Sequence, residues 1–397
     1  MSRSAMVVGG GLVGLATAYQ LLKRRVADNV RVLEKEPTVA AHQSSHNSGV
    51  LHAGLYYTPG SLKAKLAVAG IRAMTAYCRE RGVPHEVCGK VVVAVDAVEL
   101  PRLAELERRG IANGLTGVRR ISAAEAHEIE PNIRCVEALH VPEEGIADYP
   151  AVARALVADI EALGGTITTS APVHELRRDG NAWRAGTGAG DFTANVLVTC
   201  AGLHSDRIAA LAGVQHPARI VPFRGEYYTV RPERANIVRN LVYPVPDPAF
   251  PFLGVHFTRM IGGGLECGPN AVIALRREGY RWRDVSVRDM SDALLSRELW
   301  QFLKRYPSVA MHEVWRSFSK RAFLATLQRL VPSLELADLA PGGSGVRAQA
   351  IARDGTLIQD FVIERGPGAV HVINAPSPAA TASLAIGEYV AGEVAAL

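Results

Sequence analysis

VVGGGLVG, residues 7–14, is the stretch that decides the fold of this chain. Its glycines follow the pattern Gly9-x-Gly11-x-x-Gly14, after an apolar segment typical of a buried strand and before a segment typical of a helix. The first glycine permits a tight turn, the second lets a pyrophosphate approach the backbone, and the third lets helix and strand pack closely. The N-terminus of the helix then faces the phosphates. The motif predicts a βαβ unit that binds a dinucleotide.

Glu34 supports this interpretation and helps to choose the dinucleotide. It lies 20 residues after Gly14, at the end of a second apolar segment, where a carboxylate accepts hydrogen bonds from ribose hydroxyls. A carboxylate rather than an arginine argues against a 2′-phosphate. The α/β pattern then breaks off and resumes twice, and TCAGLHSD at 199–206 repeats a strand-to-glycine turn. This discontinuity favours FAD over NAD.

The overall composition limits the classes of protein that fit. A chain of 397 residues is too long for one compact core and predicts two domains. The excess of 44 Lys and Arg over 39 Asp and Glu gives a net charge of +5, which suits an anionic substrate, an acidic membrane surface or an ordinary solvated surface. The sequence has no dense basic stripe, so we expect no nucleic-acid partner.

The cysteines and the apolar segments bear on location. The five cysteines are scattered without metal-ligand spacing, which predicts a reduced chain that holds no metal. Residues 5–22 are apolar, but glycines interrupt them and Lys23, Arg24 and Arg25 follow directly, so we expect no export signal. No other run approaches the roughly 20 apolar residues of a membrane span. We expect a cytoplasmic protein, with peripheral contact on the cytoplasmic face of a membrane left open.

Periodicity and turn residues predict an α/β order of elements along the chain. Ser122 and Glu125 also have the spacing of a capping box that opens a short helix. We expect helices at 12–24, 62–80, 100–113, 151–163, 289–305 and 379–396, and strands at 5–8, 30–34, 90–95, 166–169, 173–177, 183–187, 195–200, 221–230, within 252–267, 357–363 and 370–373.

HQSSHNSGVLHAGLYY, residues 42–57, follows no strand or helix period. Its small residues let a backbone approach a flat ligand, and histidine exchanges protons near neutral pH. The segment therefore predicts a reaction site beside a cofactor.

Several longer blocks resemble the L-2-hydroxyglutarate oxidase/dehydrogenase family, within the wider group of D-amino-acid-oxidase-like flavoproteins. The resemblance extends over residues 7–396, and one small departure is Ser44-Ser45, where Thr-Gly is more usual. It implies noncovalent FAD, oxidation of L-2-hydroxyglutarate to 2-oxoglutarate, and delivery of electrons to O2 or to a membrane acceptor. The blocks are VVGGGLVGLATAYQLL, VLEKE, HQSSHNSGVLHAGLYYTPGSLKAKL, PFRGEYY, YPVPDPAFPFLGVHFTR, GPNAV, REGY, GVRAQA and NAPSPAAT.

From this resemblance we expect an α/β fold in which a Rossmann-like FAD-binding domain is interleaved with a sheet-based (α+β) substrate domain. The FAD-binding domain would comprise residues 1–83, 147–214 and 339–397. The substrate domain would comprise residues 84–146 and 215–338. The active site would lie between the two domains, where cofactor clefts commonly form.

The expected cofactor-binding residues come from four parts of the chain. NAPSPAAT at 374–381 is expected to be a turn whose free N–H groups face the flavin, although an ordinary proline-rich helix start has the same sequence character. The full set is Gly9, Gly11, Gly14, Glu34, Lys35, Gln43, Ser44, Asn47, Ser48, Gly49, Leu51, Val173, Ala201, Gly202, Pro376, Ser377 and Ala379.

His52 is the predicted catalytic base. The resemblance places it beside the isoalloxazine ring, where it would take the hydroxyl proton while C2 gives a hydride to flavin N5. The alternative is a histidine that only hydrogen-bonds the cofactor or a backbone carbonyl. His42 and His46 are expected to support the cofactor loop.

A dicarboxylate substrate needs cations, and arginine binds carboxylates best. Arg347 matches the position that holds the α-carboxylate in relatives. Arg259, beside His256, and Arg224 are candidates for the distal carboxylate, with surface or ion-pair roles as the alternative. The side chains of Tyr57, Tyr228 and Tyr243 are candidate hydroxyl donors or ordinary core residues.

Two other functions remain open at this stage. One is a different oxidase or dehydrogenase of the same group, acting on an amino acid, an amine or glycerol 3-phosphate. The other is a nucleotide-binding redox module without catalysis. The residues do not choose between O2 and a membrane acceptor, nor do they indicate an oligomeric state.

Overall fold

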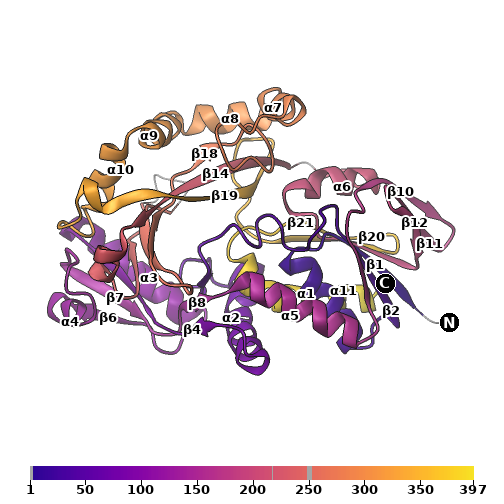
Figure 1. Cartoon of the computed structure of the whole chain (residues 1–397), viewed down its shortest axis with the longest axis horizontal. Helices are drawn as coiled ribbons and strands as arrows, with labels where there is room; N and C mark the ends of the chain where they lie inside the picture. Colours follow the sequence, from indigo (N-terminus) through magenta and orange to yellow (C-terminus); the bar gives the residue numbers. More distant parts are fainter. Residues whose placement is uncertain (1–2, 217, 248–252) are drawn as a thin grey trace.

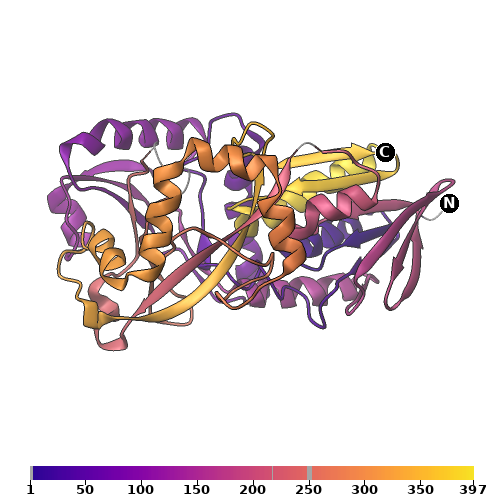
Figure 2. The same ribbon diagram turned by 90° about the horizontal axis from the view of Figure 1, so that it is seen from above.

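The computed structural model describes residues 3–216, 218–247 and 253–397, except for the side chains of 308–312. Figures 1 and 2 show an elongated molecule with a different β-sheet at each end. Both chain termini lie at the end that holds the N-terminal strand. Short 3-10 helices also occur among the described residues, at Ala97–Glu99, Gly202–His204, Pro232–Ile237 and Leu336–Asp338.

A six-stranded sheet forms the end that carries the glycine motif. Its strand order is β20-β21-β13-β1-β2-β9, and every neighbouring pair is parallel except β20 with β21. The predicted βαβ unit is confirmed as β1, α1 and β2. The strands are β1 (Ser4–Val8), β2 (Asn29–Leu33), β9 (Thr166–Thr168), β13 (Val196–Thr199), β20 (Val362–Gly366) and β21 (Ala369–Asn374), and α1 is Leu12–Lys23.

Both faces of this sheet are covered, which explains why its central strands β1, β13 and β21 are mostly apolar and buried. On β1, Ala5 and Val7 pack into the core beneath the helices, whereas Met6 and Val8 pack against a small three-stranded sheet. Gly387 lies so close to α1 that a Cβ there would be 2.6 Å from the Ala16 backbone. The helices are α1, α2 (Leu62–Arg81), α5 (Tyr149–Ala162) and α11 (Ala379–Ala395), and the small sheet comprises β10 (Val173–Asp179), β11 (Ala182–Thr187) and β12 (Gly190–Ala194), with α6 (Ser205–Leu211) nearby.

A nine-stranded sheet forms the other end of the molecule. Its strand order is β18-β14-β17-β16-β15-β5-β7-β6, and β19 pairs along β14 outside this path. The strands are β5 (Lys90–Ala94), β6 (Arg119–Ser122), β7 (Glu137–Val141), β14 (Arg219–Val230), β15 (Leu241–Pro244), β16 (His256–Arg259), β17 (Leu265–Gly268), β18 (Val272–Ile273) and β19 (Leu339–Ile351).

Helices and a small linking sheet complete this part of the fold. The predicted capping box is present, with the Ser122 side chain accepting from Glu125 N at the start of α4. The helices are α3 (Leu100–Ala112), α4 (Ala123–Ile129), α7 (Val287–Leu294), α8 (Arg297–Arg305), α9 (Pro307–Phe318) and α10 (Lys320–Leu327), and the linking sheet has the order β3 (Val50–Leu51), β8 (Gly145–Ala147) and β4 (His85–Glu86).

Three predicted elements differ from the structure. The helix expected at 289–305 is two helices, because Ser296 accepts a hydrogen bond from Leu299 N and starts α8. The strand region at 252–267 is the hairpin of β16 and β17 around a glycine turn, and residue 252 lies outside the described residues. The strand expected at 357–363 instead begins at Val362. Strand β19 and helices α9 and α10 had no sequence prediction.

The place of β19 bears on the domain division. We expected residues 339–397 in the FAD-binding domain, but β19 pairs with β14 from Leu339 to Ile351 in the nine-stranded sheet. We therefore propose that the last FAD-binding segment begins after Ile351. The other proposed boundaries stay as predictions.

Two further findings concern cysteines and membranes. All five cysteines are free thiols in the structure. Over the described residues, no helix combines the length and the apolar character needed to cross a membrane.

Candidate active site

A cavity of about 1640 Å³ lies between the two large sheets and is lined by both. Ligand pockets for small molecules usually measure roughly 300–1000 Å³, so this cavity has room for a dinucleotide together with a small substrate. Its lining runs from the glycine motif, past the segment after β3, to β14, β16 and β19.

The glycine end of the cavity fits a dinucleotide. Gly9 has φ +112°, and a Cβ there would lie 2.3 Å from the Cys200 carbonyl oxygen. A Cβ on Gly14 would lie 1.9 Å from the Gly9 carbonyl oxygen. On Gly11, by contrast, only the Ser44 hydroxyl would lie within 4 Å of a Cβ, so the backbone at the start of α1 is open to a ligand. A pyrophosphate bound at a helix N-terminus requires the close backbone contacts at Gly9 and Gly14 and the unobstructed backbone at Gly11.

Glu34, the predicted ribose ligand, lies at the dinucleotide end of the cavity. It is buried at the end of β2 and also lines the cavity. Its Oε2 accepts a hydrogen bond from Gly10 N at 2.7 Å, and its Oε1 accepts one from Glu36 N at 2.9 Å. Each carboxylate oxygen has a second lone pair, so the fixed carboxylate can still accept from ribose hydroxyls.

Most of the predicted cofactor residues line this one cavity, but three of them do not reach it. Gly14 serves the contact between α1 and the turn, Leu51 is buried in β3, and Gly49 N donates to Asn47 Oδ1 in the loop before β3. Their assignment to cofactor binding stays a prediction. The lining residues are Gly9, Gly11, Glu34, Lys35, Gln43, Ser44, Asn47, Ser48, Val173, Ala201, Gly202, Pro376, Ser377 and Ala379.

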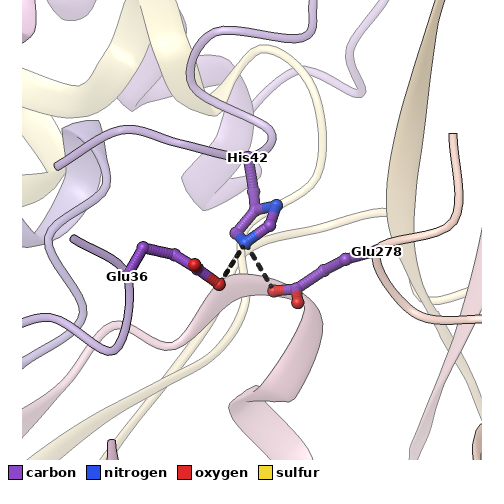
Figure 3. Close-up of side chains that lie close together, drawn as sticks. All are labelled: Glu36, His42 and Glu278. Carbon is purple, nitrogen blue, oxygen red and sulfur yellow. Dashed lines mark hydrogen bonds and ion pairs between the residues drawn. The ribbon is translucent and has the colours of Figure 1, made fainter. Parts of the chain in front are cut away.

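Glu36 and His42 of the loop after β2 meet Glu278, from the segment before α7, in a group that has the composition of a metal site. Figure 3 shows Glu36, His42 and Glu278 converging, and their ligand atoms lie within 4.8 Å of one another. The Lys35 ammonium, however, contacts all three, at 3.0 Å from His42 Nε2 and 2.8 Å from Glu278 Oε1. Burial opposes ionisation of Lys35, but hydrogen bonds to Glu278 and Glu36 raise its pKa. A cation thus already neutralises these carboxylates, and the group ties the dinucleotide loop to the segment before α7.

His52 lies at the other end of the cavity, where the chain leaves β3. Its backbone N–H donates to Thr381 Oγ1 at 3.2 Å, and Tyr149 and Val50 also contact that hydroxyl. These bonds tie the His52 backbone to the first turn of α11. The imidazole is 16% exposed, and its burial, with the nearby Lys90 ammonium, lowers the pKa of His52 below 6.5. A neutral imidazole at neutral pH is able to accept a proton.

A fully buried ion pair, Lys90 with Glu144, supports the His52 ring. His52 Nδ1 lies 3.5 Å from Lys90 Nζ and 3.6 Å from Glu144 Oε2. Glu144 Oε1 also accepts from Ala53 N at 3.2 Å. Burial opposes ionisation of Glu144, but Lys90 and His52 lower its pKa to about 2. The pair therefore keeps its charges and fixes the edge of His52 that faces away from the cavity.

Aromatic side chains enclose the space around His52. The Tyr243 ring stacks on the His256 ring at 3.9 Å between centroids, and Lys90 Nζ lies 4.0 Å from the Tyr243 centroid. His256 Nδ1 lies 2.9 Å from the Gly254 carbonyl oxygen, which makes Nδ1 the protonated nitrogen. Burial lowers the pKa of His256 to about 3, so this ring is neutral and its Nε2 is an acceptor. Tyr56 and Tyr57 also line the cavity, and burial raises the pKa of both phenols, which keeps them protonated.

Arg347 and Lys63 are two of the cations that line the cavity, and Arg102 and Arg109 of α3 line it beside the carboxylates of Asp247 and Glu105. Arg347, the predicted ligand of the α-carboxylate, comes from β19 and lies beside Tyr227, whose pKa burial raises to about 12. Lys63 comes from the first turn of α2 and had no sequence prediction. Together they make this end of the cavity suitable for carboxylates.

Arg259 and Arg224, predicted to bind substrate, are not among the described residues that line the cavity. Arg259 forms a two-pronged ion pair with Glu86, at 2.8 and 2.6 Å, and is 40% exposed. It lies three positions after His256 on β16, and an odd offset along a strand places side chains on opposite faces.

Strand alternation also places the Arg224 side chain outside the cavity. Gly225 and Tyr227 of β14 line the cavity, so Arg224 is on the other face. There it pairs with Glu226 at 2.9 Å and its guanidinium lies 4.4 Å from the Trp282 ring centroid. Tyr228, one of the candidate hydroxyl donors, is also off the cavity and packs against Phe323. Tyr57, Tyr243 and His256 do line it.

Sequence reasoning missed Lys63, Lys90, Glu144 and Tyr227. Lys90 carries one signal, because it opens KVVVA, a strand that is otherwise wholly apolar. A lysine in such a strand is buried only with a partner. Glu144 and Tyr227 have no comparable signal in the sequence.

Comparisons with known proteins concern the chain as a whole. A family model described as "FAD dependent oxidoreductase" (DAO) matches residues 4–393. An L-2-hydroxyglutarate dehydrogenase of Indibacter alkaliphilus is 46% identical, with 98% of this chain and 97% of the relative covered. The mitochondrial L-2-hydroxyglutarate dehydrogenase of Homo sapiens is 42% identical, over 98% of this chain and 88% of the relative. The L-2-hydroxyglutarate dehydrogenase of Escherichia coli K12 is 42% identical, over 99% of this chain and 93% of the relative.

Solved structures support the fold. The L-α-glycerophosphate oxidase of Mycoplasma pneumoniae, determined with FAD bound, superposes with a TM-score of 0.80 at 23% identity and covers 100% of this chain and 95% of its own. Glycine oxidase of Geobacillus kaustophilus superposes with a TM-score of 0.72 at 21% identity, over 99% and 95% of the two chains. At these identities the likeness concerns the fold alone.

Proposed function

Because the chain belongs to the DAO family of FAD-dependent oxidoreductases, we propose that it oxidises L-2-hydroxyglutarate to 2-oxoglutarate. Relatives 42–46% identical over nearly the whole chain carry the name L-2-hydroxyglutarate dehydrogenase, which supports this substrate. The observation that carries the proposal is the joint presence of a base, His52, and a carboxylate-binding arginine, Arg347, in the cavity that the glycine motif opens.

The chain's own residues would divide the work of oxidation. Bound FAD supplies a hydride acceptor, flavin N5, for the hydrogen on C2 of the hydroxy acid. His52 takes the proton of the C2 hydroxyl, so that loss of the hydride and the proton together leaves the keto group. The Glu144 carboxylate, 3.6 Å from His52 Nδ1, favours the tautomer with the proton on Nδ1, which leaves Nε2 to act as the base.

Other residues bind and orient the substrate and the cofactor. Arg347 binds the α-carboxylate next to the reacting carbon. The phenols of Tyr56 and Tyr57, which stay protonated, donate to substrate oxygens. The glycine motif and Glu34 would hold the adenosine half of FAD. The segment that leads into α11 and its first residues, from Pro376 to Thr381, would lie beside the part of the flavin ring where negative charge develops on reduction.

A substrate comparison tests this proposal. The purified protein, supplemented with FAD and an artificial dye acceptor, should form 2-oxoglutarate from L-2-hydroxyglutarate but not from the D-enantiomer. Turnover of glycine or glycerol 3-phosphate in place of L-2-hydroxyglutarate would identify the protein as a different oxidase of the family. Absence of turnover with all of these acids would favour a redox module without catalysis.

We also propose that the protein contacts an anionic membrane surface and passes its electrons to a quinone there, with O2 as the alternative acceptor. The support is a surface on α7–α9 and the segment before α7. Leu295, Phe318 and Trp315 on it are 84%, 69% and 63% exposed. We call it the α7–α9 surface, and its exposed apolar residues are Trp282, Val285, Val287, Leu294, Leu295, Trp300, Val314, Trp315 and Phe318.

Charge and position favour a lipid surface as its partner. Residues 281–321 contain nine Lys or Arg and five Asp or Glu, a net charge of +4 out of +5 for the whole chain. Three of the four tryptophans of the chain are here, and tryptophan is enriched at membrane interfaces. Helices α7–α10 form one continuous edge of the molecule (Figure 1). Exposed apolar side chains among basic ones are typical of binding to anionic lipids.

Vesicle binding tests this contact. The protein should sediment with phosphatidylglycerol-containing vesicles and less with phosphatidylcholine vesicles. Trp300→Ser with Trp315→Ser should weaken sedimentation, whereas Val98→Ser, at another exposed apolar position, should not. Equal sedimentation of the two variants with the vesicles would contradict the proposal. A protein that self-associates and does not bind vesicles would indicate that the surface binds a second copy of the chain. Comparing reduction of a soluble quinone with oxygen uptake identifies the acceptor.

A further inference from the structure

Lys63 is a cavity-lining cation without a role in the proton or hydride transfer proposed above. It lies in the first turn of α2, and its side chain lines the cavity at the end that holds His52. Its Nζ lies 4.6 Å from the centroid of the Tyr57 ring. Within the described part of the chain, its ammonium has no carboxylate at ion-pair distance. A partly buried lysine without a carboxylate partner is unusual and suggests that an external anion completes the site.

The neighbouring carboxylate, Asp360, is already engaged in another contact. Its Oδ1 accepts from Lys63 N at 2.6 Å, and its Oδ2 accepts from Leu62 N at 3.2 Å. Asp360 also accepts from Phe361 N at 2.8 Å. The carboxylate thus satisfies the first free N–H groups of α2 rather than the side chain of Lys63.

Arg347 is the second cation near Lys63. Burial lowers the pKa of Lys63 to about 8, with Asp360 opposing this shift and the positive charge of Arg347 adding to it. Two cations that repel each other in a half-buried cavity are stabilised when an anion binds both. A dianion of suitable length would neutralise both charges.

We propose that Lys63 determines specificity for dicarboxylates by binding the carboxylate remote from the reacting carbon, while Arg347 binds the other. This inference rests on the proposed function for the identity of the substrate. It assigns to α2 the role that sequence reasoning gave to Arg259 and Arg224. The substrate class is a 2-hydroxy acid whose second carboxylate reaches the N-terminal turn of α2.

The pH dependence of binding follows from the groups that face Lys63. These are Asp360 before β20, Arg347 of β19, Tyr57 and His52. Because the pKa of Lys63 is about 8, its ammonium loses a proton as the pH rises through that value, and affinity for a dicarboxylate falls there. Tyr57 stays protonated over this range because burial raises its pKa. His52 is already neutral, since its pKa is lowered.

Calorimetric binding of glutarate and pentanoate to the oxidised FAD-loaded protein tests the proposal without turnover. The two acids have the same chain length and differ in the second carboxylate. In Lys63→Met the Kd for glutarate should rise about 10- to 100-fold, because a charged hydrogen bond is lost, and the Kd for pentanoate should stay nearly constant. Lys63→Arg should retain most of the affinity. Lys65→Met, at an exposed lysine on the same helix, is the matched control.

Kinetics and pH provide independent readouts. In Lys63→Met, KM for L-2-hydroxyglutarate should rise more than kcat falls. In the wild-type protein, glutarate affinity should fall above pH 8, and this loss should disappear in Lys63→Arg. The wild-type pH profile needs no variant, so it tests the proposal even if Lys63→Met does not fold.

These experiments distinguish failure of the Lys63 proposal from failure of the proposed function. If Lys63→Met weakens glutarate and pentanoate equally, or leaves glutarate affinity unchanged, the proposal is overturned. It is also overturned if the variant loses FAD while glutarate affinity in the loaded fraction stays the same, since Lys63 would then hold the cofactor. If glutarate binding depends on Lys63 but L-2-hydroxyglutarate does not reduce the protein, the dicarboxylate site stands and the proposed function fails.

Discussion

The two ends of the cavity are built in different ways. The dinucleotide end depends on backbone shape within a short stretch, with Gly9 and Gly14 in contact with neighbouring main chain and Glu34 one strand away. The substrate end is built from side chains of distant segments, including His52, Lys63, Lys90, Glu144 and Arg347. Substitutions at the first end should therefore affect cofactor retention, and substitutions at the second should affect rate or affinity while FAD stays bound.

Gly14→Ala should have the largest effect, at the dinucleotide end. The added Cβ would lie 1.9 Å from the Gly9 carbonyl oxygen, so helix α1 must move away from the turn that receives the pyrophosphate. We expect most of the FAD to be lost, as measured by the ratio of flavin to protein absorbance. Gly392→Ala, at an exposed helical glycine with open space around it, should keep FAD and stabilise by about 0.5–1 kcal/mol. A Gly14→Ala protein with full FAD content would contradict this account.

Glu144→Gln should have the next largest effect, on the free energy of unfolding. It leaves the fully buried Lys90 ammonium without its partner, which costs about 3–5 kcal/mol in such pairs. Urea unfolding measures this loss, and Lys90→Met with Glu144→Gln should recover part of it.

The pair also predicts a pH effect on stability. The pKa of Glu144 is lowered from 4.5 to about 2 in the folded state. Its contribution is therefore complete above pH 4.5 and is lost as the pH falls towards 2. An acid transition of the same size in Glu144→Gln would show that this pair does not stabilise the fold.

His52→Ala should slow flavin reduction by L-2-hydroxyglutarate about 100-fold or more while FAD stays bound. Because the neutral imidazole is the base, kcat/KM of the wild-type protein should fall as the pH is lowered. The midpoint of this fall should lie below the ordinary pKa of 6.5. His140→Ala, on β7, is the control histidine. Stopped-flow reduction gives the rate, and near-normal reduction in His52→Ala would remove this residue from the catalytic role.

Two arginines give the smallest effects and the sharpest contrast. Arg347→Gln should lower kcat/KM for L-2-hydroxyglutarate about 10- to 100-fold, since a charged hydrogen bond to carboxylate is lost. Arg259→Gln breaks only an exposed ion pair with Glu86 and should change kcat/KM less than about twofold. Steady-state kinetics of both variants decide between the two predicted carboxylate sites. An equal loss of kcat/KM in both variants would indicate that Arg259 binds substrate.

The sequence predicts the dinucleotide end well because its determinants are local. The glycine spacing, the strand before it and Glu34 all act within one βαβ unit, and the structure confirms that unit. Helices α2, α3, α5 and α11 also begin and end within two residues of the prediction, because caps and apolar periodicity define them.

The substrate end is less predictable because strand alternation decides which side chains reach it. Arg259 is near His256 in sequence but lies on the opposite face of β16, and Arg224 is separated in the same way from Gly225. The long strand β19, which brings Arg347 to the cavity, contains glycines and a proline that hide its strand character. In the sequence, Lys63 has the character of an ordinary lysine on a helix surface. Only the position of α2 against the cavity shows that its side chain lines the site.

The most direct test of the central claim is anaerobic addition of L-2-hydroxyglutarate to the FAD-loaded protein while the flavin absorbance near 450 nm is recorded. The account predicts that the flavin is bleached by L-2-hydroxyglutarate, that 2-oxoglutarate forms in equal amount, and that D-2-hydroxyglutarate leaves the spectrum unchanged. A flavin that stays oxidised with L-2-hydroxyglutarate, but is reduced by glycine or glycerol 3-phosphate, would contradict it.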